Sequence, residues 1–127
     1  MKTPIKRPCV LIVEDHRPAR EMYRLTLEHS GFDVVEAGDG VEALLRVRDT
    51  VPDLILMDLS MPLMDGWDAT RHLKSDSRTA AIPIVMLTAH TPDGMAQATR
   101  KAGCVALVTK PCLPSDLVKK VRHCLSM

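Results

Sequence analysis

Five short apolar runs alternate with five longer amphipathic segments along this chain of 127 residues, and this alternation restricts its fold more than any other feature. Runs of four to six apolar residues have the length of buried strands. The five predicted strands are Cys9 to Val13, Asp33 to Ala37, Asp53 to Met57, Ile82 to Leu87 and Val105 to Thr109. Strands that alternate with helices form a parallel sheet covered on both faces, so the pattern predicts an α/β fold.

The segments between the runs carry residues that start and end helices. The predicted helices start at Pro18, Asp39-Gly40, Asp65-Gly66, Thr91-Pro92-Asp93 and Pro114-Ser115-Asp116, and the first ends at Ser30 before Gly31. Gly94 is expected inside the fourth helix, which it weakens by up to about 1 kcal/mol relative to alanine. In the first predicted helix, Met22, Leu25 and Leu27 can form a stripe that faces the sheet. The second carries the apolar residues Val41, Leu44, Leu45 and Val47.

Composition describes a globular protein with no bias toward a charged partner. The chain is 46% hydrophobic and 26% charged, with 17 Lys+Arg against 16 Asp+Glu. We therefore expect no direct nucleic-acid binding. No apolar stretch approaches the roughly 20 residues of a membrane span, and no secretory signal follows the basic N-terminus. These observations predict a cytoplasmic protein without membrane insertion, folded as a single domain over residues 1–127 with its core at about 9–125.

The cysteines and histidines do not have the spacing of a metal site. The four cysteines, at positions 9, 104, 112 and 124, form no CxxC pair, and none of the five histidines lies at ligand spacing from a cysteine. We expect the cysteines to be free thiols rather than disulfides or zinc ligands.

Polar residues end four of the five apolar runs. Glu14 and Asp15 follow the first run, Asp58 the third, Thr88 the fourth and Lys110 the fifth. An unpaired buried carboxylate is costly, so an acid at the end of a buried strand needs a reason. The carboxyl ends of parallel strands share one edge of the sheet, where such folds bind their ligands. The five side chains are therefore expected to lie together.

These residue types favour phosphoryl transfer assisted by a metal ion. Three neighbouring carboxylates repel one another unless a cation holds them, and an oxygen-only ligand set suits Mg²⁺ or Mn²⁺ better than zinc. A metal ion and Lys110 would neutralise a transferring phosphoryl group, with Thr88 beside it. One carboxylate would act as the nucleophile and form an aspartyl phosphate.

Five ordered motifs resemble the receiver domain of two-component response regulators. The motifs are Val13-Glu14-Asp15, Leu56-Met57-Asp58, Met61-Pro62-Leu63-Met64-Asp65-Gly66, Leu87-Thr88-Ala89 and Thr109-Lys110-Pro111. The resemblance extends from about Cys9 to Leu125. It implies a flavodoxin-like doubly wound sheet with the strand order 2-1-3-4-5.

The resemblance also implies a role for each acidic residue. Asp58 would accept a phosphoryl group from a phosphohistidine on a histidine kinase or a histidine phosphotransfer protein. Asp15 and Asp58 would bind Mg²⁺ directly, and Glu14 would act largely through water. Ser60 would contribute its backbone carbonyl to the metal.

Residues after the last three strands would contact the phosphoryl group or affect its lifetime. By the resemblance, Thr88 would bond a phosphoryl oxygen and report it to the fourth helix, with Ala89 next to it. Lys110 would pair with the phosphate, and the Lys110-Pro111 bond is expected to be cis. The side chains of Ser60 and His90 would tune the lifetime of the phosphate.

The fifth strand departs from the family pattern. Many receivers have Tyr or Phe three residues before the lysine, and this chain has Leu107 there; Cys112 stands where an aromatic residue often follows the proline. In those receivers the ring swings inward when the threonine moves. This chain lacks the ring, so that output mechanism is not transferred to it. The fourth helix, fifth strand and fifth helix are the expected face for a downstream protein, with a merely solvated face as an equal alternative. A monomer or weak dimer is expected.

Three other functions are compatible with parts of this pattern. A pseudo-receiver, which has the same fold but binds its partners without phosphorylation, is disfavoured because none of the phosphorylation-site residues is missing here. A phosphohydrolase that forms an aspartyl phosphate would need a second acid at Ser60. A flavin carrier of the same fold would meet repulsion between its phosphate and Glu14-Asp15. The leading prediction is a phosphoacceptor switch, not an enzyme, with incidental self-phosphorylation and autodephosphorylation.

Overall fold

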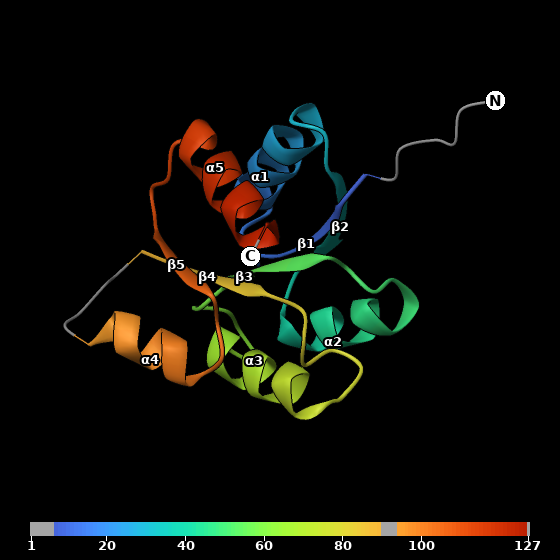
Figure 1. Ribbon diagram of the computed structural model, residues 1–127, viewed down its shortest axis with the longest axis vertical. Helices are drawn as coiled ribbons and strands as arrows, with labels where there is room; N and C mark the ends of the chain where they lie inside the picture. The colour runs from blue at the N-terminus through green and yellow to red at the C-terminus, as the bar shows by residue number, and fades with distance from the viewer. Residues whose placement is uncertain (1–6, 90–93, 127) are drawn as a thin grey trace.

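The computed structural model describes residues 7–89 and 94–126, and its five strands form one parallel sheet (Figure 1). The strand order is β2-β1-β3-β4-β5, which confirms the predicted flavodoxin-like topology. The strands are β1 Cys9–Val13, β2 Asp33–Ala37, β3 Leu54–Asp58, β4 Ile84–Thr88 and β5 Ala106–Thr109. Asp58 and Thr88 are thus the last residues of their strands, which end one residue later than predicted.

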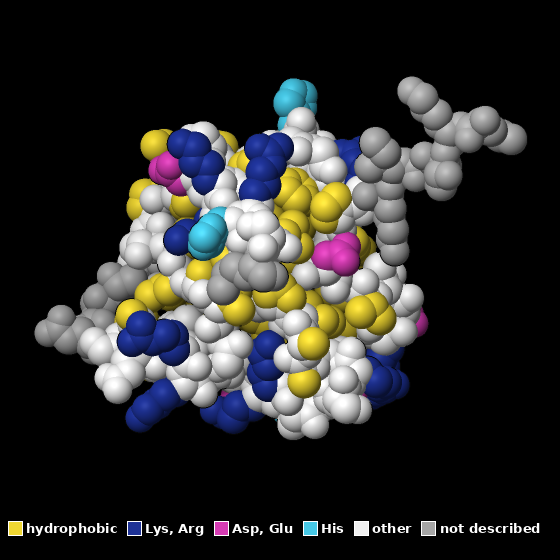
Figure 2. Space-filling view, viewed as in Figure 1, with side chains coloured by type: hydrophobic (Ala, Val, Ile, Leu, Met, Phe, Trp, Pro, Cys, Tyr) yellow, Lys and Arg dark blue, Asp and Glu magenta, His cyan; other side chains and the backbone are white. Residues whose placement is uncertain are grey.

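Helices cover both faces of the sheet. They are α1 Arg17–His29, α2 Gly40–Asp49, α3 Gly66–Ser75, α4 Met95–Lys101 and α5 Pro114–Leu125. In Figure 1, α1 and α5 lie on one side of the sheet, and α2, α3 and α4 lie on the other. Lys and Arg side chains are scattered over both helical layers in the view of Figure 2, with hydrophobic side chains between them. None of the helices in the described residues has the length and apolar character to cross a membrane.

The core consists of two apolar layers separated by the sheet. Because successive side chains of a strand point to opposite faces, Val10 and Ile12 join the layer beneath α1 and α5, while Leu11 and Val13 join the other. Strands β3 and β4 are buried along their whole length, as expected for central parallel strands. The four cysteines, all within the described residues, are thiols rather than disulfides, as predicted; Cys104 and Cys124 are buried, whereas Cys9 and Cys112 are partly exposed.

The buried face of α1 differs from the prediction. Met22 and Leu25 are 47% and 58% exposed, whereas Tyr23 and Leu27 are buried. Residues four apart share a helix face, and Leu25 and Leu27 are about 200° apart around the axis, so the predicted stripe could not all face inward. Tyr23, which prediction passed over, fills the inner position.

The apolar residues of α2 also divide between two faces. Val41 and Leu45 are exposed, whereas Ala43 and Val47 form the buried stripe and Leu44 packs partly against the core. Both pairs have the spacing of one helix face, so spacing alone could not decide between them. The structure buries the face with the smaller side chains.

Gly94 is the N-cap of α4 rather than an interior residue. Its φ is +85°, a left-handed conformation that glycine adopts without a steric penalty, and the helix begins at Met95. The predicted starting residues Thr91-Pro92-Asp93 lie outside the described residues.

Candidate functional site

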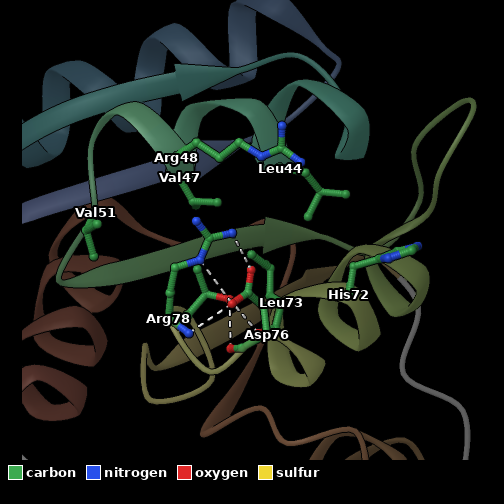
Figure 3. Close-up of a pocket in the computed structure, with 9 residues that line it drawn as sticks. Leu44, Val47, Arg48, Val51, His72, Leu73, Asp76 and Arg78 are labelled. Atoms are coloured by element: carbon green, nitrogen blue, oxygen red, sulfur yellow. Dashed lines mark hydrogen bonds and ion pairs between the residues drawn. The ribbon is translucent and has the colours of Figure 1, made fainter.

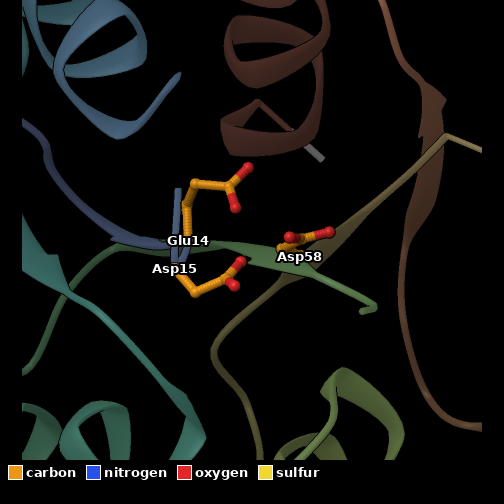
Figure 4. Close-up of side chains that lie close together, drawn as sticks. All are labelled: Glu14, Asp15 and Asp58. Carbon is orange, nitrogen blue, oxygen red and sulfur yellow. The ribbon is translucent and has the colours of Figure 1, made fainter. Parts of the chain in front are cut away.

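Three carboxylates meet at the carboxyl ends of β1 and β3. Glu14 and Asp15 directly follow β1, and Asp58 ends β3. One oxygen from each residue lies within 4.8 Å of the other two. Figure 4 shows the three side chains grouped there, with the carboxylate of Asp15 extending toward Asp58. Because β1 and β3 are adjacent parallel strands, their register fixes this meeting. We call Glu14, Asp15 and Asp58 the acidic cluster.

Burial differs across the acidic cluster. Glu14 and Asp58 are only 1% and 4% exposed, whereas Asp15 is exposed. Glu14 Oε2 accepts a hydrogen bond from the backbone N–H of His16 at 3.2 Å, and Asp58 Oδ1 accepts a long one from Ser60 at 3.4 Å. Within the described residues, the Asp15 side chain has no hydrogen bond or ion pair. Its oxygens are therefore available to a cation.

Lys110 brings one positive charge to the acidic cluster. Its Nζ lies 2.7 Å from Glu14 Oε1 and 3.3 Å from Asp58 Oδ1. Burial by itself would lower the pKa of the Lys110 ammonium, but the hydrogen bond to Glu14 and the charge of Asp58 outweigh burial and raise that pKa above 10.5. Lys110 is therefore protonated across the physiological pH range. The Lys110-Pro111 bond is cis, as predicted.

Four further predicted residues lie in or shortly after β3, β4 and β5: Ser60, Thr88, Ala89 and Leu107. Thr88 is buried at the end of β4, and the Lys110 backbone N–H donates to its carbonyl at 2.7 Å. Ala89 and Ser60 are exposed. Leu107 pairs in register with Met86 and packs partly against the core. His90 lies outside the described residues. The strand ends thus bring together Glu14, Asp15, Asp58, Thr88 and Lys110.

The loop after Asp58 returns tightly to the site through Gly66. The Gly66 N–H donates to the Leu59 carbonyl at 2.9 Å, and the preceding Asp65 caps α3 by accepting from the Asp68 N–H at 2.9 Å. A Cβ on Gly66 would lie 2.6 Å from the Asp58 carbonyl oxygen and 2.9 Å from Leu59 Cα. The first turn of α3 therefore sits directly against the backbone of Asp58. From the sequence, Gly66 is a helix start and the last residue of a family motif, and neither predicts this close approach.

Gly66→Ala is expected to destabilise the fold by about 2 kcal/mol, because overpacking against backbone outweighs the gain in helix propensity of up to about 1 kcal/mol. Urea unfolding measures the change. Gly38→Ala is the matched control, since its Cβ would meet side-chain atoms at 3.5 and 3.7 Å, which are ordinary contacts. Equal stability of the two variants would contradict the close approach.

The residues of the acidic cluster fit a divalent cation. Three carboxylates against the single ammonium of Lys110 leave a formal charge of −2 among these four side chains. Two of the carboxylates are buried, where uncompensated charge is costly. The ligands are all oxygens, which are those that Mg²⁺ prefers.

The comparison that decides the family is with protein-family models. The model described as the response regulator receiver domain matches residues 10–122. This chain belongs to that family. The chain is therefore a receiver domain of the two-component response regulators.

Similar receiver domains occur in whole proteins of different lengths. This receiver domain is 40% identical to the DNA-binding response regulator MtrA of Mycobacterium tuberculosis over 116 residues. The matched segment covers 91% of this chain and 50% of MtrA. The chain thus spans about half the length of these relatives. It is 34% identical to the polar-differentiation response regulator DivK of Brucella anthropi, over 91% of this chain and 94% of DivK.

Solved structures agree with the fold. The Vibrio cholerae chemotaxis protein CheY4 has a TM-score of 0.89 and 31% identity, covering 94% of this chain and 99% of CheY4. The receiver domain of the sensor histidine kinase PA1611 from Pseudomonas aeruginosa has a TM-score of 0.87 and 26% identity, covering 96% and 100%. That structure has a magnesium ion coordinated in its active-site cleft.

A cavity of about 200 Å³ lies away from the acidic cluster, between α2 and α3 (Figure 3). At its edge, Arg78 Nη2 lies 3.0 Å from Asp76 Oδ2, and hydrogen bonds from Arg78 lower the pKa of that carboxyl. The lining residues belong to the later turns of α2 and α3 and to the segments that follow these helices. The segment after α2 leads to the amino end of β3, and the segment after α3 leads to that of β4. The cavity is therefore at the opposite sheet edge and forms no part of the site.

Proposed function

We propose that this receiver domain is a phosphoacceptor switch in which Asp58 takes a phosphoryl group from a phosphohistidine. The arrangement around Asp58 carries the proposal. Its buried carboxylate ends a central strand, 3.3 Å from the Lys110 ammonium and beside two further carboxylates. This arrangement places a nucleophilic oxygen, a fixed cation and a site for a metal ion next to one another.

In the proposed reaction, an oxygen of Asp58 attacks phosphorus and the phosphorus–nitrogen bond of the phosphohistidine breaks. The electron pair of that bond returns to the departing imidazole, and an acyl phosphate forms on Asp58. Lys110 would keep its contact with Glu14 and pair with a phosphoryl oxygen in place of the Asp58 carboxylate oxygen. The Thr88 hydroxyl would donate a hydrogen bond to another phosphoryl oxygen.

The acidic cluster would hold Mg²⁺ during this transfer. Asp15 and Asp58 would bind the ion directly, and Ser60 would add its backbone carbonyl. Glu14 would act largely through water, because its carboxylate is already engaged by Lys110 and His16. When bound, Mg²⁺ supplies positive charge next to the phosphoryl oxygens.

We further propose that the domain works as a switch rather than as an enzyme. Its donor would be a histidine kinase or a histidine phosphotransfer protein, and its target a downstream protein bound through α4, β5 and α5. Self-phosphorylation from small phosphodonors and hydrolysis of the acyl phosphate would be incidental. The position of Leu107, where many receivers have an aromatic ring, implies that the signal reaches that face by another route.

Beryllofluoride, which mimics a phosphoryl group on a carboxylate, tests the switch. With Mg²⁺, we expect amide NMR shifts at Asp58, Thr88 and Lys110, because these residues would surround the mimic. Shifts that continue into α4, β5 and α5 would support that output face despite Leu107. A spectrum unchanged by beryllofluoride and Mg²⁺ together would favour a pseudo-receiver instead.

A further inference from the structure

Arg20 links the acidic cluster to the edge strand of the sheet. From α1, its Nη1 donates a hydrogen bond to the backbone carbonyl of Glu14 at 2.8 Å. Its Nε is buried without a hydrogen-bond partner in the described residues, and it lies at ion-pair distance, 3.4 Å, from Glu36 Oε1 of β2. The guanidinium is therefore hydrogen-bonded to a backbone oxygen in the site and paired by charge with a carboxylate outside it.

The Glu14 carbonyl belongs to the peptide group that precedes Asp15. Its orientation sets where the Asp15 side chain leaves the backbone. Because Asp15 has no side-chain bond of its own within the described residues, backbone contacts must fix its position. The Glu14 N–H donates to the Ala37 carbonyl at 3.1 Å, which holds one side of Glu14, and Arg20 holds the other.

We propose that Arg20 is a positioning residue for Asp15, and that it sets the affinity of the acidic cluster for a divalent cation. This inference rests on the proposed function, in which Asp15 binds Mg²⁺ directly. Arg20 does not touch the metal in this account. It fixes the peptide group from which the exposed ligand extends, so that less conformational freedom is lost when the ion binds.

An arginine suits this task better than a lysine. The planar guanidinium directs several N–H groups at fixed angles, so one side chain can bind the Glu14 carbonyl and Glu36 at the same time. A lysine has a single compact charge and would keep only part of this geometry.

Arg24 allows a positioning role to be separated from a purely structural one. It lies one helical turn after Arg20 and its Nε pairs with the same Glu36 at 3.6 Å. It also binds Glu28 at 2.8 Å. In the described part of the chain, Arg24 makes no contact with the acidic cluster. Loss of Arg24 thus removes two ion pairs of α1, one of them with the same Glu36, and leaves the hydrogen bond to the Glu14 carbonyl intact.

The test is the dissociation constant of Mg²⁺, measured by calorimetry for wild type, Arg20→Met, Arg20→Lys and Arg24→Met, each with its metal-free stability from urea unfolding. We expect Arg20→Met to weaken Mg²⁺ binding about tenfold, in line with losses of outer-sphere partners at metal sites. Arg20→Lys should fall between wild type and Arg20→Met. Arg24→Met should bind Mg²⁺ as wild type does, with a stability loss similar to that of Arg20→Met.

A second readout follows the backbone itself. In the metal-free protein, hydrogen exchange at the amides of Asp15 and His16 should accelerate in Arg20→Met and not in Arg24→Met. Suppose that the wild type binds Mg²⁺ and accepts phosphoryl groups. Equal Mg²⁺ affinity of the two methionine variants would then overturn the role of Arg20 and leave the proposed function standing. Failure of the wild type to bind Mg²⁺ would overturn the proposed function as well.

Discussion

Asp58→Asn is expected to abolish Mg²⁺-dependent uptake of a phosphoryl group from acetyl phosphate. The amide that replaces the carboxylate lacks the anionic oxygen that attacks phosphorus, so no acyl phosphate can form at this position. Wild type should gain one phosphoryl mass, detected by intact-protein mass spectrometry, and the variant none. The substitution removes one of three carboxylates that repel one another, and it also removes one contact of Lys110. Since the two effects oppose each other, the variant should be no less stable than wild type.

Asp49→Asn is the matched control for this experiment. Asp49 is an exposed residue at the end of α2 and, among the described residues, it makes no ion pair. Its variant should be phosphorylated as wild type is. Uptake of one phosphoryl mass by Asp58→Asn would show that another side chain is the acceptor, and the assignment of Asp58 would have to be given up.

Much of the fold could be predicted because the strands and the sheet edge follow from simple patterns. Apolar runs of strand length located all five strands, and parallel pairing then placed the residues that end them at one edge. The meeting of Glu14, Asp15 and Asp58 required only that β1 and β3 be neighbours. Helix faces were harder, since α1 and α2 each carry apolar residues on more than one side.

The parts of the site that escaped prediction depend on contacts between elements. The role of Gly66 arises because α3 begins against the Asp58 carbonyl, a proximity that no local pattern encodes. Arg20 looks like an ordinary polar residue of an amphipathic helix until Glu14 and Glu36 are seen on either side of it. Gly94 shows the same limit, because a glycine inside a helix and a glycine at its cap differ only in backbone conformation.

Lys110→Met is expected to lower the metal-free free energy of unfolding by about 3 kcal/mol, because it leaves the Glu14 carboxylate, 1% exposed, without its cation. Urea unfolding measures the loss. Saturating Mg²⁺ should restore part of the stability, since a divalent cation at the acidic cluster replaces the missing charge. Phosphoryl uptake should remain slow even then, because the ammonium that would pair with the phosphoryl group is absent.

The pH dependence of the same pair gives a further check. Since folding raises the pKa of Lys110, its contribution to stability is complete below pH 10.5 and is lost as the pH rises through the folded-state pKa. The stability difference between wild type and Lys110→Met should therefore be constant at neutral pH and shrink in strongly alkaline solution. Lys119→Met, at an exposed position of α5 without an ion pair in the described residues, should match wild type throughout. A Lys110→Met protein as stable as Lys119→Met without Mg²⁺ would show that Glu14 does not depend on Lys110 for its charge balance.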